Sequence, residues 1–374
     1  MTGSIQGSMV RSVKVEMVDG SITRTVVGHD GLPIEHIEIF LNYLRTIRSS
    51  PNTVTAYASH LALLFRWLDI RGVPWIAIDF DGLCMFVQDL QDGTVPALTP
   101  SGHFRPIAAR SRSTTEAVLA AVCSFFEYWR LEGVGPQDLR LYRDARSSKS
   151  SRFSFLAHVE QRRVRQERRI KVRGPKAPLP KVIDFESDFQ RLIGASSTAR
   201  DRALLCALYD GGLRIGQVLG LRHEDLDLAG HRISVVRREN NTNGAMSKQR
   251  TPFSVAMPGR FFTYYAESLI QEQSPLGIES DYVFVNLNGA RVGRPMTYSN
   301  AIQIVESIGS RAGVPLTPHM LRHTHATDLA KRHWTAAQIA KRLGHSSATS
   351  AEIYTHLGVD DITERYRQTF GGGQ

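Results

Sequence analysis

The sequence predicts a mainly α-helical protein with a small antiparallel β-sheet, divided into two domains. Apolar residues recur at helical spacing over most of the 374-residue chain, which predicts the helices. Two segments with strand character, residues 231–237 and 251–256, flank a turn-rich stretch and predict the sheet. A Pro/Gly-rich segment between Gly174 and Pro180 divides the chain. Because 42% of the residues are hydrophobic, each part can form its own core.

The first domain is predicted to be a helical unit over residues 31–140, and the segment before it, residues 1–30, is predicted to be flexible. Ser113 and Glu116 have the spacing of a capping box at the start of the last helix. Residues 92–111 are rich in Gly, Pro, Ser and Thr and are expected to form a loop. The expected helices each have one apolar face and cover about residues 34–44, 54–68, 82–90 and 113–129.

A basic linker is predicted over residues 141–180. Between residues 143 and 173 the chain has eleven Lys and Arg against three Asp and Glu, and the charge is densest from 161 to 169. Such a segment either lies along a nucleic-acid backbone or is a solvated connection, and composition alone favours the second interpretation. The four arginines that the first interpretation selects are Arg162, Arg163, Arg168 and Arg169.

The second domain is predicted over residues 181–374 and is mostly helical. Its sheet is expected near its start, and Gly211-Gly212 is expected to end a helix and to present Leu213-Arg214. The expected helices cover about residues 185–193, 199–210, 215–221, 259–273, 298–312, 319–332, 336–343 and 348–356.

Composition limits the class of binding partner and the cellular compartment that we expect. The net charge of +10 and the pI of about 9.7 favour a polyanionic partner, of which nucleic acid is the commonest. Cys84, Cys123 and Cys206 lie in apolar stretches without metal-ligand spacing, so we interpret them as core residues of a cytosolic protein. No apolar run approaches the length of a membrane span, and the start lacks a signal-peptide core. We therefore expect a cytoplasmic location in a bacterium, with the protein on the nucleoid when bound to DNA.

Six polar residues of the second domain form a candidate catalytic set. Histidine transfers protons near pH 7, arginine matches a phosphate, and tyrosine can act as a nucleophile. These are the groups needed to attack a phosphodiester without a metal. In chain order the candidates are Arg214, Lys248, His319, Arg322, His345 and Tyr354.

The order and local contexts of these residues resemble the tyrosine recombinases, also called the phage integrase family. Four blocks carry the resemblance, together with Asn52 to Tyr57 in the first domain, and the likeness spans roughly residues 34–370. It implies a helical core-binding (SAM-like) domain followed by a catalytic domain. The blocks are Ala207 to Ile215, Ser247 to Thr251, Thr317 to His323, and Leu343 to His345 with the tyrosine nine residues later.

The resemblance also implies a function and individual roles. The chain is expected to be a site-specific DNA recombinase that integrates, excises or transposes a mobile element through a 3′-phosphotyrosyl link to Tyr354. Arg214 and Arg322 would bind the phosphate, His319 would assist removal of the tyrosine proton, and Lys248 would protonate the leaving 5′ oxygen. His345 would donate to a phosphate oxygen. No cofactor or metal is expected.

The expected partner is double-stranded DNA with specific recombination sites, bound by a homotetramer, with an accessory directionality protein as a further expectation and no membrane. In this context we prefer the DNA-tracking interpretation for the distal half of the basic linker. His319 and His323 have a spacing that can bind zinc, but no glutamate stands beside His319 and no cysteine is near, so we do not expect a metal site.

One departure from the family pattern follows the first arginine. The family commonly has Ile-Ser-Glu there, whereas this chain has Ile215-Gly216-Gln217 and lacks that carboxylate. Three alternatives to a recombinase stay open: a non-catalytic DNA-binding protein on the same fold, DNA relaxation like that of a type IB topoisomerase, and metal-dependent hydrolysis, which a chelator would abolish. The first predicts decay of the six-residue set, which is not seen, and the second predicts action without a defined site.

Overall fold

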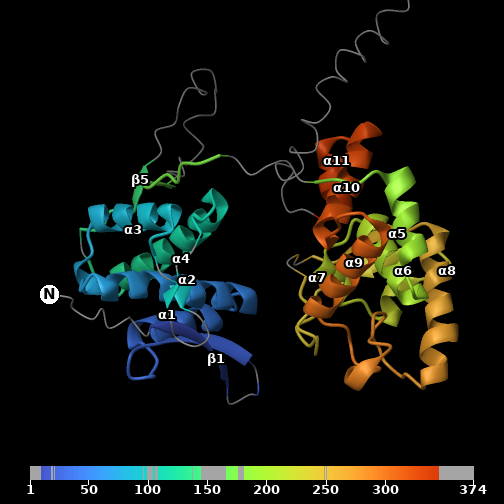
Figure 1. Cartoon of the computed structure of the whole chain (residues 1–374), viewed down its shortest axis with the longest axis horizontal. Helices are drawn as coiled ribbons and strands as arrows, with labels where there is room; N and C mark the ends of the chain where they lie inside the picture. The colour runs from blue at the N-terminus through green and yellow to red at the C-terminus, as the bar shows by residue number, and fades with distance from the viewer. Residues whose placement is uncertain are drawn as a thin grey trace, which may run out of the picture. The chain divides into compact units, whose positions relative to one another are not determined.

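The chain divides into two compact units, Met1–Pro178 and Leu179–Gln374, and each is treated separately (Figure 1). Both are mainly helical with small antiparallel sheets, so the predicted fold class is confirmed. The computed structural model describes residues 10–17, 20, 22–95, 97–98, 104–105, 108–136, 138–144, 166–175, 181–247, 249 and 251–344.

The first unit contains the predicted helices, which pack around one core. Its α4 begins differently from the expectation, because Ser111 is the N-cap and its Oγ accepts from the Thr114 N–H at 3.3 Å. The expected capping box of Ser113 and Glu116 is wrong, since Glu116 pairs with Arg112 at 2.8 Å. The helices are α1 (Glu35–Thr46), α2 (Pro51–Ile70), η1 (Trp75–Ala77), α3 (Phe80–Asp92) and α4 (Arg112–Leu131).

The prediction that residues 1–30 are flexible is wrong for the part that the structure describes. Strands β1 (Arg11–Glu16) and β2 (Ile22–Val27) form an antiparallel hairpin that packs on α2. The Arg66 guanidinium on α2 is 6% exposed and donates to the Val10 carbonyl at 3.0 and 3.2 Å. Val10 and Val26 enter the core. Apolar and polar residues do alternate in β1 around Val13 and Val15, but the hairpin is buried only because α2, further along the chain, packs on it.

The described parts of the predicted basic linker, residues 141–144 and 166–175, belong to the first unit. Strand β5 (Tyr142–Asp144) pairs with β6 (Gln166–Arg168), and Leu141 and Val172 are buried in the same core. The expected loop before α4 also contains two short paired strands, β3 (Ala97–Leu98) and β4 (Phe104–Arg105). Cys123 is a buried core residue of this unit.

The second unit follows the predicted order, and its sheet runs β7-β8-β9. The β8–β9 register places Ile233 opposite Val255, and both are buried. Its helices are η2 (Phe185–Phe189), α5 (Gln190–Ala195), α6 (Ala199–Tyr209), α7 (Ile215–Val218), η3 (His223–Asp225), α8 (Gly259–Glu267), η4 (Ser268–Gln273), η5 (Ser274–Leu276), η6 (Gly289–Arg291), α9 (Tyr298–Ala312), α10 (Pro318–Lys331) and α11 (Ala336–Leu343). Its strands are β7 (Leu226–Asp227), β8 (Arg232–Val235) and β9 (Phe253–Ala256). The helix expected at 348–356 lies outside the described residues.

Helix α6 runs through the centre of the second unit, with every residue but Arg202 buried. Because α6 is buried on all sides, the turn that follows it also lies inside the unit, next to α10 and α11. By contrast, α11 packs its apolar side on α10 in a small cluster separate from the main core, made by Ala326, Ile339, Ala340 and Leu343. The ends of α6 and α11 therefore meet beside α10, and this meeting point positions the candidate site.

Candidate active site

A glycine turn after α6 brings the first candidate arginine to the meeting point. Gly212 has a φ of 58°, which favours glycine, and a Cβ there would lie 2.6 Å from His325 and 2.7 Å from Leu343. Only glycine lets the turn approach α10 and α11 this closely. Arg214 follows as the N-cap of α7, and its backbone N–H donates to Gln217 Oε1 at 2.8 Å.

Helix α10 supplies two further candidates from one side. Its N-cap is Thr317, whose side chain accepts from the Met320 N–H at 3.3 Å, and a proline occupies the first turn. His319 and Arg322 are three residues apart on this helix, so they lie on the same face one turn apart. Arg322 is 2% exposed.

The Arg322 guanidinium fastens α10 to both neighbouring segments. Its Nη2 donates to the Leu343 carbonyl at 2.9 Å, and its Nη1 donates to the Gly212 carbonyl. A buried cation is costly unless it is bound by hydrogen bonds, and here two backbone carbonyls supply them. The arginine therefore fixes the turn before Arg214 and the end of α11 relative to α10.

His319 shares an electrostatic environment with both arginines. Burial lowers the pKa of His319 from its ordinary value, and the positive charges of Arg322 and then Arg214 lower it further. The imidazole is therefore neutral at pH 7 and can accept a proton. Its ring meets His323 edge-on at a centroid distance of 4.1 Å. The structure thus brings Arg214 close to His319 and Arg322, which follow it in the sequence by more than 100 positions.

The segment around position 248 contacts both α7, which follows Arg214, and the end of α11. A Cβ on Gly216 would lie 2.8 Å from the Met246 carbonyl oxygen, so α7 and this segment are in close contact. At Gly344, which ends α11 with a φ of 63°, a Cβ would overlap the Gln249 side chain. The described residues on both sides of Lys248 therefore contact the helices next to Arg214 and before His345.

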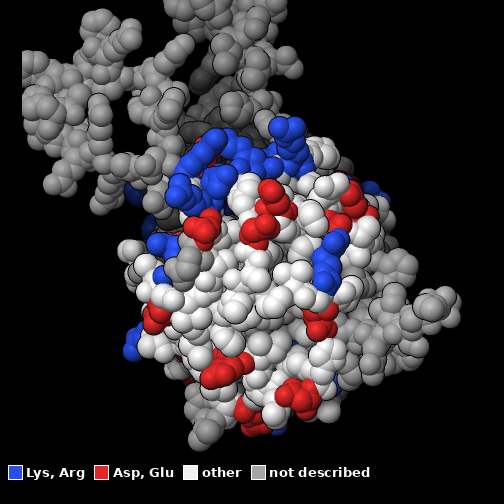
Figure 2. Space-filling model, turned by 90° about the vertical axis from the view of Figure 1, so that its left-hand side faces the viewer, with Lys and Arg blue, Asp and Glu red and all other residues white. Residues whose placement is uncertain are grey.

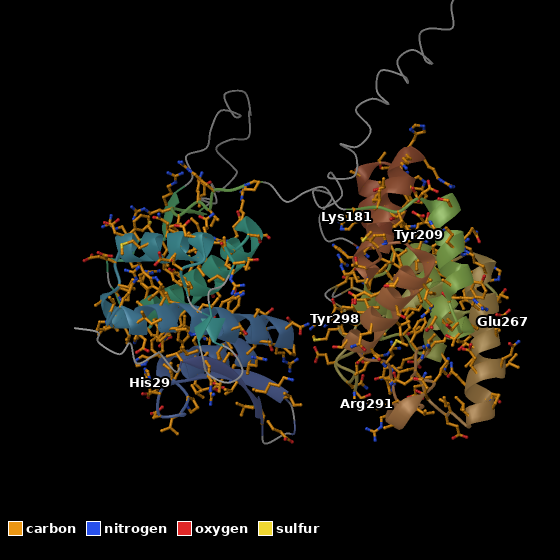
Figure 3. All side chains as sticks on the ribbon, viewed as in Figure 1. His29, Lys181, Tyr209, Glu267, Arg291 and Tyr298 are labelled. Atoms are coloured by element: carbon orange, nitrogen blue, oxygen red, sulfur yellow. The ribbon has the colours of Figure 1, made fainter. Side chains whose placement is uncertain are left out.

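Tyr209 is the conspicuous buried tyrosine near the described part of the site, at the end of α6 (Figure 3). Its hydroxyl donates to Asp328 Oδ2 at 2.5 Å. Burial and the Asp328 carboxylate raise its pKa well above the ordinary value for tyrosine. A phenol that is held in this way and resists ionisation is a poor nucleophile, so Tyr209 does not compete for the role expected of Tyr354.

The remaining sequence candidates fall into two groups. Lys248, His345 and Tyr354 lie outside the described residues, as do Arg162 and Arg163. The other two linker arginines, Arg168 and Arg169, belong to the first unit.

Arg168 and Arg169 stand at the end of β6 in the first unit. The Arg169 guanidinium lies 3.9 Å from the centroid of the Phe80 ring, and its Nη1 donates to the Arg140 carbonyl at 3.0 Å. Figure 2 shows that Lys and Arg gather at this end of the unit's visible face, while the remainder is uncharged or mixed. Arg169 therefore packs on Phe80 within the first unit, and it also belongs to the group of exposed basic residues at this end. The exposed basic residues beside β5 and β6 are Arg140, Arg143, Arg169, Lys171 and Arg173.

Sequence reasoning missed Arg342, which reaches from α11 into this meeting point. Its Nη2 donates to the carbonyls of Asp210 and Ala256, each at 2.8 Å. From the sequence it is only a cation in the last turn of a helix, a common and uninformative position. Gln217, which the sequence marked only as a lost carboxylate, is 3% exposed, and its Oε1 accepts from the Arg214 N–H at 2.8 Å.

The part of the chain that the structure describes offers neither a metal site nor a membrane span. Within it, no three His, Cys, Asp or Glu side chains are grouped so that they could hold a metal ion. No helix within the same residues is long and apolar enough to cross a membrane.

Comparison with known proteins places these features in a family. A sequence model of the phage integrase family matches residues 184–360, and a model of the phage integrase N-terminal SAM-like domain matches residues 37–133. Transposase A from transposon Tn554 of Staphylococcus aureus is 33% identical over 337 residues, which covers 90% of this chain and 91% of the relative. The chain belongs to the phage integrase family. It is therefore a tyrosine recombinase, an enzyme that transfers DNA strands.

Other members of the phage integrase family agree with this assignment. Tyrosine recombinase XerD of Bifidobacterium longum is 28% identical over 330 residues, covering 84% of this chain and 89% of XerD. The integrase of transposon Tn1549, solved in complex with transposon right end DNA, shares the fold. Its TM-score is 0.58 at 15% identity, over 89% of this chain and 98% of that one.

Proposed function

We propose that this recombinase cuts and rejoins duplex DNA at specific sites through Tyr354. The phenolic oxygen attacks the scissile phosphorus, the bond from phosphorus to the 5′ oxygen breaks, and a 3′-phosphotyrosyl link and a free 5′-hydroxyl result. The energy of the phosphodiester is kept in the link, so rejoining is the reverse attack by a 5′-hydroxyl. The convergence of Arg214, His319 and Arg322 carries this proposal, since it supplies a phosphate clamp beside a neutral base.

Each residue of the set then has one task. Arg214 and Arg322 bind the non-bridging oxygens, where negative charge grows during the attack. His319, neutral at pH 7, helps remove the proton of the tyrosine. Lys248 gives a proton to the leaving 5′ oxygen, and His345 donates to a phosphate oxygen. The proposed set contains the groups for charge neutralisation and proton transfer within the chain, and the proposal includes no metal or cofactor.

The biological use that we propose is transposition of a mobile element. The support is the relative named as a transposase, which matches nine tenths of this chain. Four protomers would act on two DNA sites and exchange strands pairwise, with an accessory protein setting direction. The protein would work in the cytoplasm of a bacterium and lie on the nucleoid when bound to DNA. The arginines of the basic linker, Arg162 and Arg163 first, would contact the DNA backbone.

A nicked suicide duplex carrying an end of the element tests the chemistry. Incubated with the protein and a chelator, it should yield a covalent protein–DNA adduct at the 3′ phosphate. Tyr354→Phe should abolish the adduct without weakening DNA binding. The matched control is Tyr298→Phe, which removes a hydroxyl from a tyrosine that is 56% exposed at the start of α9 and should react like the wild type.

The outcomes separate the alternatives. An adduct that persists in Tyr354→Phe would show that another residue is the nucleophile. Specific DNA binding without an adduct on any end would favour a non-catalytic DNA-binding protein. Relaxation of supercoiled DNA that lacks the element's ends would favour a topoisomerase-like activity.

A further inference from the structure

We infer that Arg342 is a positioning residue for strand cleavage, and that its guanidinium sets the end of α11 against the ends of α6 and β9. The inference rests on the proposed function, because it concerns the segments that lead into the proposed catalytic residues. Arg342 touches none of the reacting groups in the described structure and would act through the backbone that carries them.

One guanidinium group joins three chain segments. Arg342 Nη2 donates to the Asp210 carbonyl at the end of α6 and to the Ala256 carbonyl at the end of β9, both at 2.8 Å. Figure 1 shows that α6, α10 and α11 belong to the same unit although they are far apart in the chain. The contact therefore links segments that the sequence separates by 86 and 132 positions.

Each of these segments lies close in the chain to a proposed catalytic residue. Arg214 follows the Asp210 carbonyl by four residues, and His345 follows Arg342 by three. Strand β9 is the strand that follows Lys248. A displacement of Arg342 thus acts on Arg214 and His345 over four and three residues and on Lys248 over eight, and active sites lose rate steeply with small displacements.

Helix α11 needs such a link because its apolar anchoring is slight. It has eight residues, and its buried side chains Ile339, Ala340 and Leu343 form a cluster with α10 rather than with the main core. This cluster holds α11 on α10, whereas its close approaches to Gly212 and Gln249 come from Leu343 and Gly344 at its end. Polar contacts at its end must supply the remaining restraint.

A second guanidinium makes the restraint specific in orientation. Arg322 binds the carbonyls of both Gly212 and Leu343, and Arg342 on α11 binds the Asp210 carbonyl. The turn after α6 and the end of α11 are therefore joined by two arginines. With one of these contacts alone, α11 could rotate about it, whereas the two contacts together also fix the rotation of α11. This arrangement fixes the direction in which the chain leaves α11 at Gly344.

The chemistry of the contact does not favour a purely stabilising role. Burial lowers the pKa of Arg342, and the Asp210 carboxylate, whose charge acts in the opposite direction, is already bound by Arg260 at 2.9 Å. Arg342 therefore places a partly buried charge against neutral carbonyls. An apolar side chain would serve packing at least as well, because desolvation offsets much of what a buried charge gains.

Two variants of the full-length protein test the inference. Arg342→Gln should lower the rate of adduct formation at saturating suicide duplex about 10- to 100-fold, while the dissociation constant for DNA changes less than about twofold. In the free protein, amide hydrogen exchange in α11 should become faster while exchange in α9 stays unchanged. Arg342→Lys should recover part of the rate, because an ammonium group donates to the same carbonyls.

Arg311→Gln is the matched control. Arg311 also donates to a backbone carbonyl, that of Ala195 at 3.0 Å, and it links α9 to α5 away from the site. Its variant should react like the wild type. Equal adduct rates for Arg342→Gln and the wild type would overturn the inference, as would unchanged exchange in α11 or an equal loss in Arg311→Gln. A wild-type protein that forms no adduct would instead overturn the proposed function.

Discussion

Gly216 lies directly against the backbone of Met246, because a Cβ on Gly216 would be 2.8 Å from the Met246 carbonyl oxygen. The family commonly has serine at this place. Here glycine lets the segment that leads to Lys248 rest on α7, two residues after Arg214. The departure from the family pattern is therefore a packing feature of this chain, and its removal should disturb the proposed general acid.

We predict that Gly216→Ser lowers the rate of adduct formation about 10-fold or more, since the new side chain must push the segment before Lys248 away from α7. The DNA affinity should hardly change. Gly194→Ala is the control, because nothing lies within 4 Å of the added Cβ and alanine favours the helix. A Gly216→Ser protein that cleaves at the wild-type rate would show that Lys248 does not depend on this contact.

The two arginines that we propose as the phosphate clamp should differ in how much their loss destabilises the protein. We expect Arg214→Gln and Arg322→Gln each to lower adduct formation by about 10² to 10³-fold or more. Arg322→Gln should in addition lower the free energy of unfolding, by about 1–3 kcal/mol for each buried carbonyl left unsatisfied, because it releases Gly212 and Leu343. Thermal unfolding together with the suicide assay separates the two effects. Equal unfolding temperatures for the two variants would contradict the anchoring role of Arg322.

The sequence predicted the helical domains because their apolar faces repeat over many turns. The hairpin at residues 11–27 escaped prediction, since its strands are short and its burial depends on α2, which supplies Arg66 for the Val10 carbonyl. Caps were less reliable than helices: Ser111 replaces Ser113 because both hydroxyls precede the same apolar run.

The proposed catalytic residues could be named from the sequence more readily than the residues that hold them. Arg214, His319 and Arg322 stand in recognisable blocks, and the structure brings them together. Arg342 and Gly216 have no comparable signal, because their importance lies in what they touch far along the chain. A carbonyl 132 positions away, such as that of Asp210, cannot be read from the surroundings of Arg342.

Stability of the second unit should fall with acid because of His325. Burial, followed by the charges of Arg342 and Arg322, lowers the pKa of His325 from 6.5 to about 3. Between these pH values the unfolded chain binds more protons than the folded one, so the free energy of unfolding decreases as the pH falls. The decrease should be about 1.4 kcal/mol per pH unit below pH 6.5.

His325→Leu should flatten this pH dependence, as measured by calorimetry between pH 7.5 and 4.5. His333→Asn is the control, since His333 is exposed with a φ of 65° that asparagine tolerates, and it should keep the wild-type slope. An unchanged slope in His325→Leu would show that other groups cause the acid sensitivity.

The salt dependence of DNA binding should separate the linker arginines into two kinds. Arg162→Gln with Arg163→Gln should reduce the slope of log K against log salt by about 2, one unit for each lost phosphate contact. Arg169→Gln should instead lower the unfolding temperature of the first unit, because Arg169 packs on Phe80 and binds the Arg140 carbonyl. Arg130→Gln is the control, an exposed arginine paired with Glu127 at 2.6 Å. If the double variant and this control share one slope, the linker is only a solvated connection.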